Sequence, residues 1–129
     1  MGQRKSSQPA LDPDILGRML FEAAESGDSA MLKQVLGGTG GSEAQVLNWA
    51  NPLQGGQTPL IAACQMGEAA CVKALLSYSR VDVNQASHDH NWTPLFFACK
   101  HAHADCVKLL LAQRGIDTNK AEKLFSAPL

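Results

Sequence analysis

Apolar residues recur along the chain in short groups, and neighbouring groups differ in side-chain size. Between Thr58 and Gly67 the repeated apolar positions hold small alanines and a cysteine, whereas the group after Gly67 holds Val and Leu at the spacing of one helical face. This pattern predicts two short helices joined by a tight turn. Thr58 followed by Pro59 predicts the start of the first helix, and Gly67 predicts its end.

The same pattern returns 35 residues later. When residues 58–92 are laid over residues 93–127, 14 of the 35 positions are identical, against roughly two or three expected by chance. The identical pairs include Thr58/Thr93, Pro59/Pro94, Leu60/Leu95, Ala63/Ala98, Cys64/Cys99, Cys71/Cys106, Val72/Val107 and Asn84/Asn119. An internal repeat of this length indicates stacked copies of one helical unit, because a single unit cannot bury its own apolar face.

A weaker copy lies upstream at an offset of 40 residues. Residues 20–28 align with residues 60–68, and the extra residues fall in the glycine-rich stretch 37–41 and after it, which we interpret as a loop insertion. Asp12 and Pro13 predict the start of its first helix. We expect that helix to bury one stripe of side chains, namely Ile15, Leu16, Met19, Leu20, Ala23 and Ala24.

The two strong copies resemble the ankyrin repeat. Residues 58–68 read TPLIAACQMGE and residues 93–103 read TPLFFACKHAH, which are similar to the TPLHxAAxxGH signature of that family. The resemblance implies an all-α solenoid of helix-turn-helix units joined by β-hairpin-like loops. Ile61 and Phe96 replace the His of the signature, which implies the loss of a stabilising hydrogen bond.

The resemblance divides the chain into a single repeat domain, residues 12–129, behind a short tail. We expect residues 1–11 to be disordered because they are polar. The first unit covers residues 12–47, the second unit residues 48–82 and the third unit residues 83–117. The remainder is interpreted as a closing hairpin or as the start of a fourth unit at residues 126–129, which read SAPL.

Charge and composition exclude several function classes. The formal net charge is −1 and 45% of the residues are hydrophobic, which argues against both a nucleic-acid-binding protein and a disordered chain. The apolar runs are too short to span a bilayer, and the N-terminal residues have no apolar core of a secretory signal. We therefore expect a cytoplasmic protein, with the nucleus as the alternative.

The cysteines and histidines raise the question of a zinc site. Cys99 and Cys106 flank two histidines, with two more nearby, and these are the ligand types of structural zinc; the histidines are His88, His90, His101 and His103. However, the same cysteine positions recur as Cys64 and Cys71 in a copy that has no histidine. We interpret all four cysteines as small buried packing residues, and we predict no metal site, no cofactor and no catalytic residue.

The resemblance implies a protein-interaction function, with binding on the concave face formed by the hairpins and the first helices. Trp92 is the strongest candidate for a hot spot there, with packing against the neighbouring finger as the alternative. Trp49 is predicted to pack the inserted segment. Mapped onto this sequence, the binding positions are Gln54, Gln57, Gln65, Met66, Asp89, His90, Trp92, Lys100 and His101, with Glu25 and Ser26 in the first unit. We expect a monomer that binds another protein, with neither nucleic acid nor a small-molecule substrate.

Two modifications complete the predictions. Residues 1–6 read MGQRKS and match the N-myristoylation pattern, so a lipidated Gly2 would make the protein a membrane-tethered adaptor. One acyl chain with two basic residues gives only reversible membrane binding. The resemblance also implies that a hairpin asparagine, here Asn84, is a candidate for asparaginyl hydroxylation.

Overall fold

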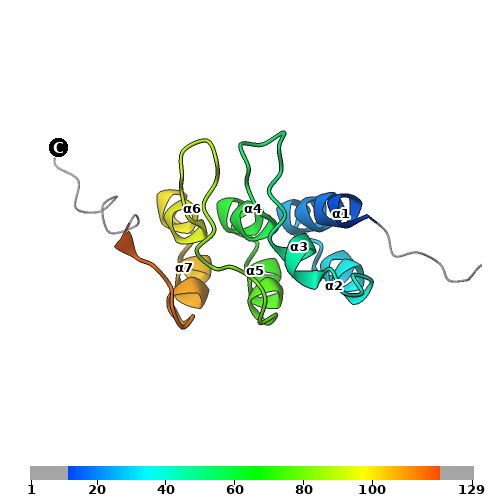
Figure 1. Cartoon of the computed structure of the whole chain (residues 1–129). Helices are drawn as coiled ribbons and strands as arrows, with labels where there is room; N and C mark the ends of the chain where they lie inside the picture. Colours follow the sequence, from blue (N-terminus) through cyan, green and yellow to red (C-terminus); the bar gives the residue numbers. More distant parts are fainter. Residues whose placement is uncertain (1–11, 120–129) are drawn as a thin grey trace, which may run out of the picture.

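The computed structural model describes residues 12–119, and within this range the chain forms seven helices and no β-strand. The helices are α1 (Pro13–Ser26), α2 (Ser29–Gly37), α3 (Glu43–Leu47), α4 (Pro59–Met66), α5 (Ala69–Leu76), α6 (Pro94–Lys100) and α7 (Ala104–Leu111). Figure 1 shows them in two layers, with α1, α4 and α6 in one and α2, α5 and α7 in the other. The predicted all-α repeat fold is confirmed.

The first helix of each unit begins where the sequence predicts. The hydroxyl oxygens of Thr58 and Thr93 accept hydrogen bonds from the N–H groups of Ile61 and Phe96, each at 3.2 Å. Asp12 caps α1 through its carboxylate. In all three helices a proline occupies the first turn, where the absent N–H leaves no hydrogen bond unmade.

The first helices of the second and third units are followed by the same left-handed turn, but different residues form it. Gly67 ends α4 in the left-handed conformation, with φ of 73°, as expected for glycine. Helix α6 ends at Lys100, and Ala102 takes the left-handed conformation with φ of 59°. Because a Cβ in this region is crowded by the backbone, the alanine costs roughly 1–2 kcal/mol that glycine would not.

Replacing Ala102 by glycine is therefore expected to stabilise the protein by about 0.5–1 kcal/mol, after the greater flexibility of glycine in the unfolded chain is deducted. The measurement is the midpoint of urea unfolding followed by circular dichroism. An Ala112→Gly variant serves as the control, because Ala112 has φ of −77° and the change should destabilise there. A lower midpoint for Ala102→Gly would contradict the strain at this turn.

The inserted segment is partly helical, which corrects the sequence prediction of a loop. After the turn at residues 38–42 the chain forms α3, whose Val46 and Leu47 are fully buried. These two apolar residues pack the short helix onto the core of the first unit. Trp49 follows and, as predicted, packs this region: its ring meets Phe21 edge-on with centroids 6.3 Å apart, and it lies directly against Gly17.

The buried stripe of α1 differs from the prediction at two positions. Leu16, Leu20, Ala23 and Ala24 are buried, but Ile15 is 51% exposed and Met19 is only partly buried. Phe21 is buried instead, at the position that Ile61 occupies in the second unit. The reason is that α1 packs against α2, α3 and α4, so more than one stripe of its surface is covered.

In the second and third units an asparagine side chain links the beginning of the unit to the loop at its end. Asn84 donates from Nδ2 to the carbonyl oxygen of Gly115 and accepts the N–H of Asp117 at Oδ1, both at 2.8 Å. Asn48 makes the same pair of bonds, at 3.0 and 2.7 Å, with Arg80 and Asp82 in the second unit. These links hold successive loops at a constant offset along the stack.

Some predictions concern residues outside the described range. They are the disordered tail at residues 1–11, the lipidation of Gly2 and the closing hairpin or fourth unit at the C-terminal end. Across residues 12–119, no helix has the length and apolar character needed to cross a membrane.

Candidate interaction surface

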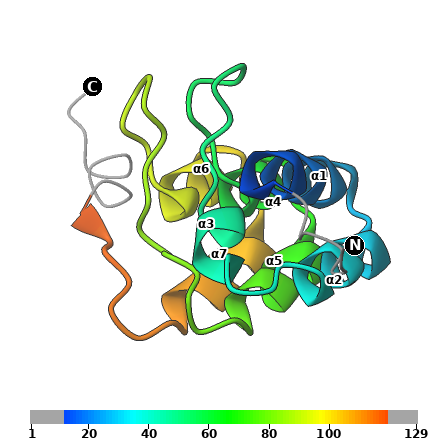
Figure 2. The same cartoon turned by 45° about the vertical axis from the view of Figure 1, so that its right-hand side comes forward.

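The loops that precede α4 and α6 project beyond the layer of first helices and form two fingers (Figures 1 and 2). Gln54 is exposed on the first finger, while Gln57 is partly buried at its base, where the N–H of Asn51 donates to the Gln57 carbonyl oxygen at 2.8 Å. The fingers are joined because the N–H groups of His88 and Asp89 both donate to the carbonyl oxygen of Gly55. Backbone hydrogen bonds therefore connect the two fingers to each other.

The third unit carries a continuous run of aromatic rings, which we call the aromatic row: His90, Trp92, Phe96, Phe97, His101 and His103. Trp92 stacks with His90 at 4.5 Å and with Phe96 at 4.8 Å between ring centroids, and it meets Phe97 edge-on at 5.5 Å. Phe97 stacks with His101, which in turn stacks with His103. The row runs from the second finger to the turn after α6.

Charged side chains attach to this row. The ammonium group of Lys100 lies over the Trp92 ring, with Nζ 5.5 Å from its centroid. The Asp89 carboxylate lies 4.0 Å from His90 Nε2. The pKa of Asp89 is lowered mainly by a hydrogen bond with the Ser87 side chain. A hydrogen bond with the His90 backbone and the charge of His90 lower it further. Asp89 thus carries a negative charge at the fingertip.

The equivalent positions of the second unit are not aromatic. Where the third unit has Trp92, Lys100 and His101, the second unit has Gln57, Gln65 and Met66. Met66 is 51% exposed. The backbone carbonyl oxygen of Gln65 already has a partner, because it lies 3.0 Å from His103 Nε2. The two units therefore offer chemically different surfaces on one continuous face.

Sequence reasoning selected part of this row. It named His90, Trp92, Lys100 and His101, and the structure brings these four together. It missed Phe96 and Phe97, which lie at the positions of Ile61 and Ala62 in the second unit. The exchange of aliphatic for aromatic residues between aligned repeats is the signal that would have found them.

Trp92, the predicted hot spot, is only partly exposed. Its side chain is partly buried, and the rings that cover it belong to its own unit. The Trp92 backbone closes the second finger, because its carbonyl oxygen accepts the Ser87 N–H at 2.9 Å and its N–H donates to Ser87 Oγ. Trp92 therefore fixes the finger and presents only part of its ring.

The cysteines are free thiols with packing roles. Cys64, Cys71 and Cys106 are buried, and burial raises the pKa of each thiol, most strongly for Cys64. Cys99 is only partly buried, which corrects the prediction that all four are buried; it lies on α6, which packs against α4 and α7. Among residues 12–119, no three His, Cys, Asp or Glu side chains come together as metal ligands would.

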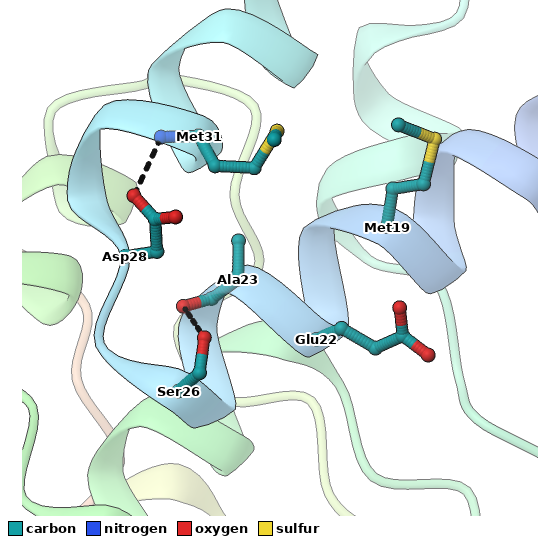
Figure 3. Close-up of a pocket in the computed structure, with 6 residues that line it drawn as sticks. All are labelled: Met19, Glu22, Ala23, Ser26, Asp28 and Met31. Carbon is teal, nitrogen blue, oxygen red and sulfur yellow. Dashed lines mark hydrogen bonds between the residues drawn. The ribbon is translucent and has the colours of Figure 1, made fainter.

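A separate cavity of about 230 Å³ lies on the outer side of the first unit (Figure 3). Its lining residues are Met19, Glu22, Ala23, Ser26, Asp28 and Met31. The polar groups of Asp28 and Ser26 are already used, since Asp28 caps α2 through the Met31 N–H and Ser26 Oγ donates to the Ala23 carbonyl oxygen. The cavity has no arrangement of acid, base or nucleophile.

Asn84, the candidate for hydroxylation, is partly buried and uses both ends of its amide to hold the next loop. A modifying enzyme would have to open these bonds to reach the side chain. Hydroxylation of Asn84 stays a prediction.

Comparison with known proteins agrees with the repeat architecture. A family model for ankyrin repeats in three copies matches residues 20–122. A search of curated proteins found no match to the chain.

Proposed function

Because the chain belongs to the ankyrin-repeat family, whose repeats generally mediate protein–protein interactions, we propose that it binds a partner protein on the concave face of its fingers and first helices. The observation that supports this proposal is the aromatic row with its attached Lys100. Tryptophan is among the residues that contribute most to binding energy, and here it is held on a rigid frame. The family is typically non-enzymatic, and we propose the same for this chain.

The mechanism is recognition by a preformed surface. The fingers are fixed by backbone hydrogen bonds, and the rings of the third unit are held by one another. Little conformational entropy is then lost by the module on binding, so more of the contact energy appears as affinity. We propose that a single copy of the chain suffices, without a cofactor.

Replacing Trp92, Lys100 and His101 together by alanine is expected to abolish partner capture. The measurement is retention of proteins from the native lysate on the immobilised chain, identified by mass spectrometry. The control replaces Lys73, Lys108 and Leu111, three exposed residues of α5 and α7, and should retain the same partners. Helical circular dichroism must be kept by both variants. Unchanged capture by the first variant would refute the concave-face assignment.

The second candidate is a membrane-tethered adaptor, favoured by the MGQRKS sequence at residues 1–6. A myristoyl group on Gly2 would add reversible membrane attachment to the same interaction surface. The intact mass of the protein isolated from its own host tests the tether. A mass without the myristoyl group on Gly2 would contradict membrane tethering.

We also propose that the protein works in the cytoplasm. Its four cysteines are free thiols, and Cys71 and Cys106 are buried between stacked helices, an arrangement suited to a reducing compartment.

A further inference from the structure

All four histidines of the chain lie in the third unit, at positions 88, 90, 101 and 103. The binding positions hold a carboxylate, that of Glu25, in the first unit and no charge in the second, while the third unit combines Lys100 and the histidines with the carboxylate of Asp89. Only the last part of this face has a charge that histidine protonation can raise.

Ring contacts hold these cations in place. His90 and Lys100 both lie against Trp92, and His101 stacks with Phe97, which is only 4% exposed. His90 and His101 nevertheless remain exposed to solvent, as does Lys100. The side chains of His90, Lys100 and His101 are thus held close to fixed positions while their polar ends stay accessible. Binding a partner then costs little additional side-chain entropy.

We propose that the third unit binds an acidic segment of the partner protein, and that this binding becomes tighter as the pH falls below 7. The inference rests on the proposed concave-face function and names the chemistry of the partner. Carboxylates of the partner would lie against Lys100, His101 and His90. Glu25 would repel the same segment from the first unit, and Asp89 would repel it from the fingertip, so the partner's carboxylates are directed toward Lys100 and His101.

The charges around each histidine determine the size of the effect. His90 faces its own neighbour Asp89 at 4.0 Å and shares the Trp92 ring with Lys100. His101 faces His103, while His103 is bonded to the Gln65 carbonyl oxygen of α4. On other elements, the Glu68 carboxylate at the start of α5 lies beside Gly27 of the first unit, and Asp105 lies in the first turn of α7. Of His90 and His101, only His90 therefore has a carboxylate within 4.0 Å among the described residues.

The direction of the pH effect follows from proton linkage. A carboxylate placed beside a histidine favours the protonated imidazole, so the complex binds more protons than the separate molecules. Affinity must then rise as the pH falls through the range in which imidazoles gain a proton, about 7.5 to 5.5. It falls again near pH 4, where the carboxylates of the partner become neutral.

The test uses the full chain and a short peptide of alternating glutamate and glycine, with a glutamine–glycine peptide as the uncharged comparison. Nuclear magnetic resonance titration should show shifts of the Trp92 indole and His101 ring signals with the glutamate peptide alone. Binding at about pH 6 should be at least about fivefold tighter than at about pH 7.5. Replacing Lys100 and His101 by glutamine should weaken it about tenfold, while the same change at Lys73 and Lys108 should not.

Three outcomes would overturn the inference: equal binding of both peptides, binding without pH dependence, or tighter binding of a single-stranded oligonucleotide to the same residues. The His101→Gln variant separates the two cations, since it should remove most of the pH dependence and keep the contribution of Lys100. If lysate capture depends on the aromatic row but the glutamate peptide fails, the concave-face function stands and only the acidic partner is rejected. If capture itself is independent of the row, the proposed function fails first.

Discussion

Replacing Phe21 by alanine is expected to lower the free energy of unfolding by about 3–5 kcal/mol. Phe21 is 1% exposed and meets the Trp49 ring edge-on, so its removal leaves a cavity between α1 and the inserted segment. Repeat proteins of three units derive much of their stability from the interfaces between neighbours. A loss of this size removes a large part of the total, which for natural domains is about 5–15 kcal/mol.

The measurement is urea unfolding followed by far-ultraviolet circular dichroism and by tryptophan fluorescence. The Leu53→Ala variant is the control, because Leu53 is 82% exposed on the first finger and its removal should change stability by less than about 0.5 kcal/mol. Equal stability of the two variants would mean that Phe21 does not pack α1 against the insertion.

Replacing Gly67 by alanine is expected to destabilise the protein by about 2–3 kcal/mol, for two reasons. Its φ of 73° is strained for any residue with a Cβ, and the new methyl group would occupy space already filled by the His103 ring. Displacing that ring also breaks the contact of His103 Nε2 with the Gln65 carbonyl oxygen. The effect therefore extends from one turn to the interface between the second and third units.

Two variants separate these causes by urea unfolding. Gly37→Ala adds a methyl group at the end of α2, where no atom lies within 4 Å, and it should leave stability unchanged or raise it by about 0.5–1 kcal/mol. Combining Gly67→Ala with His103→Ala removes the clash and leaves the backbone strain. If the loss of unfolding free energy in the double variant equals the sum of the losses in the two single variants, the methyl group and the ring do not meet.

The repeat made the helices predictable. Identical residues at a 35-residue period mark equivalent environments, so Thr58 and Thr93 had to cap helices of the same kind, and both do. The aromatic row was only half predictable. His90, Trp92 and His101, with the attached Lys100, were found from their positions in the repeat. Phe96 was noted only as a replacement of the signature His, and Phe97 was not singled out.

The remaining differences come from places where the repeat is broken. The segment after Gly37 has no counterpart in the other units, so α3 could not be inferred by alignment. Phe21 is buried and Ile15 is exposed, contrary to the prediction, because α1 is covered by the inserted segment as well as by α4. Ala102 shows the opposite case, in which the backbone keeps the repeat conformation although the glycine is absent.

The sequence by itself determined the architecture, because the 35-residue period and the caps at Thr58 and Thr93 are local features that the second and third units share. Only the tertiary structure decided which side chains form the proposed interaction surface. Whether Trp92 contacts solvent, Phe97 or Lys100 depends on the angle of the finger and on the ring rotamers. These are set by bonds between units, such as those from His88 and Asp89 to Gly55, and a linear pattern does not contain them.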